Sequence, residues 1–164
     1  MAWPREREQH VNKRIDIAGV YRLFVAALLL LVAGSPALAA TPPVHRLAIQ
    51  VSTSDAQTMN LVLNNAANVS TYYTGLGQQV QIEIVAFGPG LKMLREDSSP
   101  VKARLKSFGE SMPNVRFDAC NNTLQAMEKA EGKTIQLVPE AHIVPAGVVR
   151  LMTLEEEGWS YLRP

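Results

Sequence analysis

The single cysteine of this sequence, Cys120, is the residue whose chemistry is most distinctive. Residues 115–119 are typical of a strand that Cys120 closes, and Asn121, Asn122 and Thr123 then predict the capped start of a helix. The free N–H groups and the dipole of a helix N-terminus stabilise an anion. A thiolate is such an anion, so the position predicts a lowered cysteine pKa, suited to attack on sulfur or to formation of a persulfide. The alternative is a small buried hydrophobe at a strand end.

Three other segments could contribute to a site. Gly88, Pro89 and Gly90 follow the clearest strand pattern and could let a substrate or partner approach the backbone, or could form a plain turn. Residues 52–55 (Ser-Thr-Ser-Asp) could bind an anion at a helix start, or could only cap that helix. In parallel sheets functional groups gather at the carboxyl ends of the strands, which is where both segments and Cys120 are expected.

His142, with Glu140 close to it in the sequence, is a candidate base for Cys120. The alternative is a solvent-exposed loop histidine, because about twenty residues separate it from the cysteine and nothing in the pattern brings them together.

Composition excludes several classes of site. One cysteine excludes a disulfide within the chain and a cysteine-cluster metal site. No metal-ligand spacing, Ser/His/Asp set, phosphate-binding loop or dinucleotide fingerprint is present, so neither metal nor cofactor is expected. After residue 40 the chain carries 11 Lys and Arg against 12 Asp and Glu, and this balance gives no electrostatic case for nucleic acid.

The first 40 residues are typical of a secretory signal peptide. Arg22 precedes a short apolar run over 23–33, residues 34–36 (Gly-Ser-Pro) break it, and residues 37–39 (Ala-Leu-Ala) match a cleavage site. Cleavage is expected near Ala39 or Ala40, with a periplasmic or secreted product and no stable membrane span afterwards. The alternative is a retained N-terminal anchor helix. Residues 41–44 are expected to form a linker into one domain over 45–164.

Strand and helix patterns alternate through that domain. Strands are expected at 46–51, 80–87, 115–119, 134–138 and 159–162, with helices between them and a loop over 139–145. This alternation predicts an α/β fold: a mostly parallel sheet of about five strands with helices on both faces.

Several segments, in their order along 45–164, resemble the DsrE/DsrF-like family in its YchN-like branch. They are the asparagine-rich helix over 63–68, the strand and turn over 85–91, the segment 117–124 around Cys120, residues 144–148, and the ending 157–161. The resemblance implies a compact α/β fold assembled into trimers or hexamers. It also implies, from some relatives, a persulfide on the cysteine after the third strand, which Cys120 matches. Those sulfur-relay relatives are cytoplasmic and have an alanine-rich segment where this chain has residues 121–123.

The leading hypothesis is therefore a periplasmic sulfur carrier or sulfurtransferase. Cys120 would exchange sulfane sulfur with a small sulfur compound or a relay partner protein, Asn121, Asn122 and Thr123 would steady the charged sulfur, and Gly88–Gly90 would border the site. A second hypothesis is a non-catalytic oligomeric binding or assembly module with a structural cysteine. A third is a thiol redox protein that forms an intermolecular disulfide, which would need a partner thiol.

Overall fold

The computed structural model of this chain describes residues 43–164. The expected signal peptide and the first residues of the expected linker lie outside the described residues. Within the described range, no helix combines the length and apolar character needed to cross a membrane.

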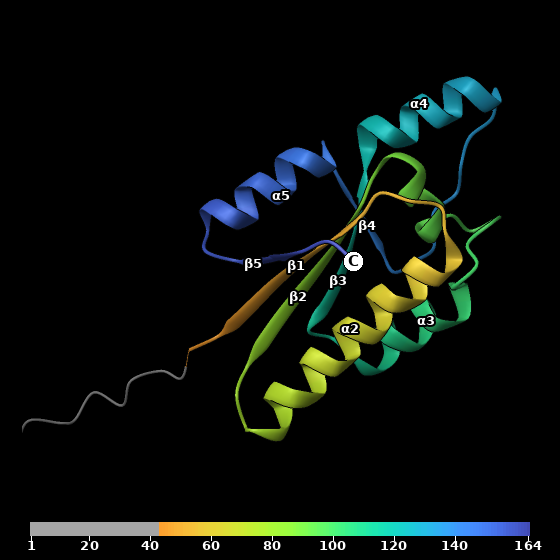
Figure 1. Ribbon diagram of the computed structural model, residues 1–164. Coiled ribbons are helices and arrows are strands. Elements are labelled where there is room, and N and C mark those ends of the chain that lie inside the picture. The colour runs from red at the N-terminus through yellow and green to blue at the C-terminus, as the bar shows by residue number, and fades with distance from the viewer. Residues whose placement is uncertain (1–42) are drawn as a thin grey trace, which may run out of the picture. The chain divides into compact units, whose positions relative to one another are not determined.

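Five parallel strands form one sheet with the order β4-β3-β2-β1-β5 (Figure 1). The elements in chain order are β1 (His45–Val51), α2 (Ala56–Gly75), β2 (Val80–Ala86), the 3-10 helix η1 (Gly88–Leu94), α3 (Lys102–Ser111), β3 (Val115–Cys120), α4 (Asn121–Glu131), β4 (Ala141–Val144), α5 (Gly147–Glu156) and β5 (Ser160–Leu162). The expected α/β fold is thus confirmed.

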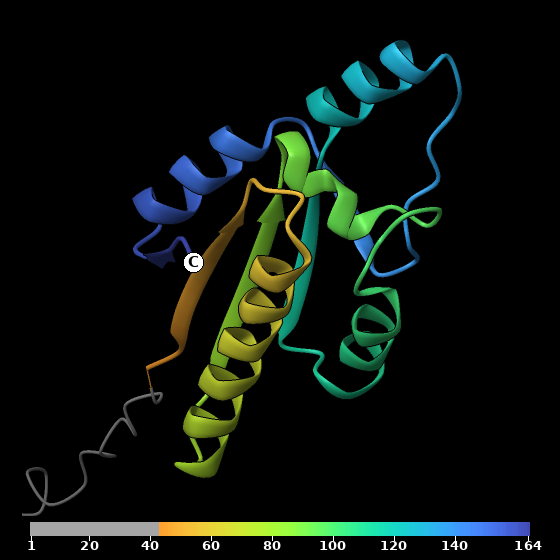
Figure 2. The same cartoon turned by 45° about the vertical axis from the view of Figure 1, so that its right-hand side comes forward.

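The strand order decides which face each helix covers. From β1 to β4 each new strand adds on the same side, whereas β5 returns to the other side of β1. Since parallel crossovers are right-handed, the reversal places α5 on the face opposite to α2 and α3 (Figure 2). The sheet is therefore covered on both faces, and this explains why β2 is buried along almost its whole length.

The larger part of the core lies between the sheet and the layer of α2 and α3. Inward-facing strand residues such as Ile49, Ile84 and Phe117 pack against Leu63 of α2 and Leu105 of α3, all of them at most 2% exposed. On the opposite face the apolar cluster is small: Ala48 and Val85 of the sheet meet Leu151 and Leu154 of α5. The two faces thus differ greatly in apolar content.

The expected fourth strand at 134–138 is wrong, because β4 lies at Ala141–Val144, within the expected loop. Residues 134–138 run beside the end of η1, where Leu137 forms an isolated antiparallel bridge with Arg95, and Ile135 and Val138 belong to the apolar core. Their apolar side chains are buried without belonging to a ladder. β4 is a short edge strand with exposed Ile143, so it lacks the apolar run of a central strand.

Candidate functional site

The chain passes from β3 into α4 without a loop, and Cys120 is the junction. It is the last residue of β3 and the N-cap of α4, so the helix begins at Asn121 rather than after a cap made by residues 121–123. The side chain is buried, with the residue 5% exposed. The thiol makes no capping hydrogen bond, but it occupies the N-cap position, where a Ser, Thr, Asp or Asn oxygen usually accepts from the first turn of a helix.

Two helix N-termini converge on the sulfur. Burial raises the pKa of the Cys120 thiol, but hydrogen bonds from the Thr123 hydroxyl, from Gly147 N–H and from the N–H groups of Thr123 and Asn122 outweigh it. The net result is a pKa below the ordinary value of the thiol. Thr123 and Asn122 belong to the first turn of α4, and Gly147 is the first residue of α5. The arrangement stabilises a thiolate or a persulfide anion.

Gly147 is a glycine because α5 starts against the site. A Cβ at this position would lie 3.0 Å from Phe87 Cβ and 3.3 Å from Cys120 Cβ. Contacts at these distances would push the first turn of α5 away from the sulfur. A small residue here therefore lets the amide of α5 reach Cys120.

Thr123 joins the cysteine to the glycine turn. Gly88 N–H donates to Thr123 Oγ1 over 3.0 Å, and the same hydroxyl helps to lower the pKa of the Cys120 thiol. Gly88 has φ 52°, a conformation that favours glycine, and it begins the 3-10 helix η1, with Pro89 as the second residue. Gly90 faces β1, where its Cβ position would be 2.1 Å from the Val51 carbonyl oxygen. Gly88 thus borders the site, whereas Gly90 serves the packing of η1.

The contacts of the other candidates are with groups other than the sulfur. Asp55 accepts from Thr58 N–H over 2.7 Å and caps α2, which confirms the capping interpretation of residues 52–55. His142 is exposed on β4, where its register partner is Asp118 rather than Cys120. Glu140 packs against Gly109 of α3. Neither side chain is among the groups that donate to the thiol.

A buried charge cluster lies on the same face of the sheet as Cys120, and the sequence analysis missed it. Glu83 of β2 and Asp118 of β3 are 3% and 0% exposed. Arg150 of α5 donates to both carboxylate oxygens of Glu83 through Nε and Nη2, with Nη2 to Oε2 at 2.7 Å, and its Nε lies 3.7 Å from Asp118 Oδ2. Arg116 Nε donates to Asp118 Oδ1 over 2.7 Å. The sequence does contain an indication of this cluster, because Glu83 and Asp118 are charged residues within strands that are otherwise mostly apolar.

Asp118 is predicted to make the protein more stable at acid than at alkaline pH. Burial and the neighbouring Glu83 carboxylate raise its pKa to about 7. The folded state therefore binds more protons than the unfolded state above the ordinary value of 3.8, and the free energy of unfolding falls as pH rises to about 7. Asp118→Asn should raise this free energy by roughly 1–3 kcal/mol at about pH 8 and hardly at all at about pH 4, measured by urea unfolding.

Asp97 provides a control of opposite sign. Arg95 holds the pKa of this exposed carboxyl below its usual range. Its contribution is present above the ordinary pKa and is lost as pH falls, so Asp97→Asn should lower the free energy of unfolding at neutral pH. Equal pH profiles for Asp118→Asn and the unmodified protein would contradict the assignment.

Comparison with known proteins supports the fold. No family model and no curated protein matches the chain. A solved structure that resembles it is that of MTH1491, a protein of unknown function from Methanobacterium thermoautotrophicum. The two are 29% identical, with a TM-score of 0.62, and the match covers 73% of this chain and 99% of the other. The chain shares its fold with MTH1491.

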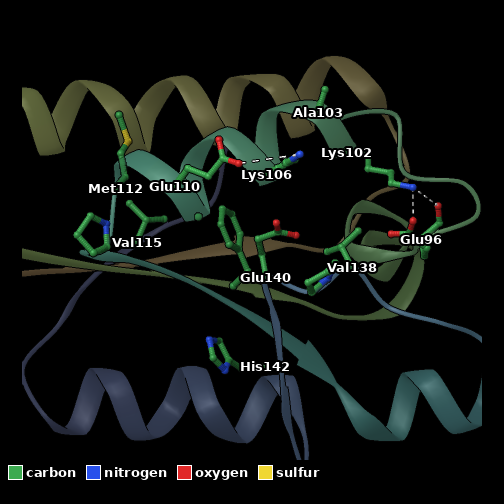
Figure 3. A pocket seen from close by; sticks show the side chains of 14 residues that line it. Glu96, Lys102, Ala103, Lys106, Glu110, Met112, Val115, Val138, Glu140 and His142 are labelled. Atoms are coloured by element: carbon green, nitrogen blue, oxygen red, sulfur yellow. Dashed lines mark hydrogen bonds and ion pairs between the residues drawn. The ribbon is translucent and has the colours of Figure 1, made fainter.

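Two hollows remain beside these elements. One, of about 860 Å³, lies between η1 and α4, along α4 from Asn122 to Ala130. The other, of about 990 Å³, lies between α3 and the approach to β4, with an apolar floor that includes Phe117 and Val138 (Figure 3). Ion pairs of α3, Lys102 with Glu96 and Lys106 with Glu110, lie along its rim. Within residues 43–164, no group of three or more His, Cys, Asp or Glu side chains could hold a metal ion.

Proposed function

We propose that this chain is an exported sulfur-handling protein of the DsrE/DsrF-like kind, with Cys120 as the sulfur-carrying residue. The observation that supports it best is the position of the thiol, buried between the N-termini of α4 and α5 with its pKa lowered. A thiol that only fills space in the core does not need two helix N-termini beside it. The first 40 residues add the expectation of export, since they have the pattern of a signal peptide.

The proposed step is a transfer of sulfane sulfur to the thiolate. The Cys120 thiolate attacks the outer sulfur of a persulfide R–S–SH, a new S–S bond forms, the old one breaks, and the thiolate RS⁻ leaves. The proton stays on the outer sulfur, so Cys120 becomes a persulfide without any other oxidant or reductant. The Thr123 hydroxyl and the amides of Asn122, Thr123 and Gly147 steady the anionic sulfur before the transfer. Passing the sulfur to an acceptor thiol is the same step in reverse.

Loading of sulfur is expected to require Cys120. Purified protein from residue 41 onward, incubated with an excess of polysulfide, should gain one sulfur atom in intact mass, and Cys120→Ser should gain none. Alkylation of the unmodified protein should follow an apparent pKa below about 8.5, the value of a free cysteine. Thr123→Val should raise this apparent pKa and Thr123→Ser should leave it nearly unchanged, since serine keeps the hydroxyl. A Cys120→Ser protein that gains the same sulfur adduct would overturn the proposal.

An oligomeric binding or assembly module is the second candidate, and a specific surface favours it. Val148, Val149 and Met152 of α5 are each 54–59% exposed. Such a group of exposed apolar side chains is typical of an interface. This candidate predicts a thiol that reacts with an alkylating reagent only after denaturation, so the alkylation experiment also decides between the two. An oligomer, such as the trimer or hexamer that the resemblance implies, agrees with either.

A further inference from the structure

Two polar contacts hold α4 against η1, one at each end of the helix. At the start of α4, Thr123 accepts from Gly88 N–H over 3.0 Å. At its end, Glu131 Oε2 accepts from Arg95 Nη2 over 3.0 Å, and Arg95 also binds Asp97. The two elements are thus fastened at both ends.

Between the two contacts, α4 and η1 leave an open apolar groove. Of the residues of α4 only Leu124 is buried, so the helix does not close onto η1 along its length. Ala126 and Ala130 lie one turn apart with small side chains, and Met127 and Pro89 complete the apolar walls. The volume of about 860 Å³ is in the range of sites for small organic ligands.

The charges around the groove favour an anion. No carboxylate lines it, and the guanidinium of Arg95 is neutralised by Asp97 and Glu131. Lys92 also lines the groove, and its ammonium makes no ion pair within the described residues. An apolar molecule that carries one anionic group would therefore match both the walls and the charge.

One end of the groove reaches the candidate site. Gly88, Asn122 and Thr123 line this end, and Asn122 and Thr123 belong to the first turn of α4, the helix whose N-cap is Cys120. We propose that the groove binds the organic part of the sulfur donor, an apolar persulfide with a carboxylate or sulfonate group that Lys92 attracts. This inference rests on the proposed sulfur transfer. It specifies R in R–S–SH and leaves the transfer step itself unchanged.

Binding is tested first without sulfur chemistry, in Cys120→Ser protein with phenylbutyrate and phenylbutanol as probes, followed by NMR titration. Phenylbutyrate should shift signals of α4 and η1 and bind more tightly than the alcohol.

Variants in the same Cys120→Ser background locate the binding site. Ala126→Trp fills the groove and should weaken the binding of both probes about tenfold or more. Gln125→Trp, at the exposed neighbouring position, should leave the binding of both probes unchanged. Lys92→Gln should weaken only the acid, with Lys129→Gln as its control. No binding, or equal losses in the two tryptophan variants, would overturn the inference.

Sulfur loading then separates this inference from the function on which it rests. With Cys120 present, Ala126→Trp should slow loading from the persulfide of a mercaptoalkanoate about tenfold and leave loading from inorganic polysulfide unchanged. Equal slowing with both donors would contradict the groove as the donor site. If neither donor loads the unmodified protein while phenylbutyrate still binds, the sulfur function fails and the groove stands as a ligand site.

Discussion

Replacing Arg150 by methionine is expected to lower the free energy of unfolding by about 3–5 kcal/mol. Arg150 provides the cation that holds Glu83 through two guanidinium nitrogens, and Glu83 is 3% exposed. Methionine keeps much of the length of the side chain but leaves the carboxylate buried without its counter-charge. The cost of such an unpaired charge far exceeds the loss of a surface ion pair.

The deficit should shrink as the solution becomes acid. Burial raises the pKa of Glu83, but the hydrogen bonds and charge of Arg150 outweigh it and hold the pKa below the ordinary 4.5. The stabilisation is therefore fully present above that ordinary value and is lost as pH falls through the folded-state pKa. Urea unfolding at several pH values, with the unmodified protein beside the Arg150→Met variant, measures this difference.

Two further variants make the Arg150→Met result specific. Lys106→Met removes a cation from an exposed pair with Glu110 and should change the free energy of unfolding by less than about 1 kcal/mol. Adding Glu83→Gln to Arg150→Met removes the orphaned charge and should recover a large part of the loss. If Lys106→Met costs as much as Arg150→Met, the buried pair has no special role.

Gly90→Ala is the second large effect that we expect, with a loss of about 3 kcal/mol or more. The added Cβ would lie 2.1 Å from the carbonyl oxygen of Val51 and 2.5 Å from its carbonyl carbon. Both atoms are backbone, and the oxygen already accepts from Phe87 N–H over 3.1 Å. Relief therefore requires η1 to move away from the end of β1. Thermal or urea unfolding of the variant measures the loss.

Two other glycines serve as controls for Gly90→Ala. Gly75 at the end of α2 has no atom within 4 Å of its Cβ position, so Gly75→Ala should change the free energy of unfolding by less than about 0.5 kcal/mol. Gly88 also has open space but a φ of 52°, and Gly88→Ala should cost about 1–2 kcal/mol through the backbone alone. A Gly90→Ala protein as stable as Gly75→Ala would show that η1 and β1 are not in close contact.

Local pattern was enough to predict the fold class and the three central strands. β2 and β3 are buried along almost their whole length and β1 over its second half, and their apolar runs are bounded by caps and glycines. The sequence pattern did not predict β4, because an edge strand that pairs with one neighbour needs few apolar residues. Residues 134–138 resembled a strand because Ile135 and Val138 are buried in the core, although they belong to no strand. Periodicity reports burial, and burial outside a ladder gives the same signal.

The candidate site was predictable only in part, for a related reason. The position of Cys120 before α4 follows from adjacent residues, and the approach of Gly88 follows from the meeting of parallel strand ends. The contribution of Gly147 depends on where α5 begins after the chain has left β4, which local sequence does not reveal. The pairing of Glu83 with Arg150 joins residues 67 positions apart and likewise needs the tertiary structure.

The unequal covering of the two sheet faces has a consequence for how the thiol becomes accessible. α5 is held by a small apolar cluster and by the ion pairs of Arg150 with Glu83 and Asp118, so we expect that detaching it costs less than opening the larger apolar core against α2 and α3. Detachment would remove the amide of Gly147 from the sulfur and uncover it in the same motion. With α5 in place, the thiol has the lower pKa but is buried. With α5 detached, the thiol is accessible to larger reagents but has lost the amide of Gly147, so its pKa is higher.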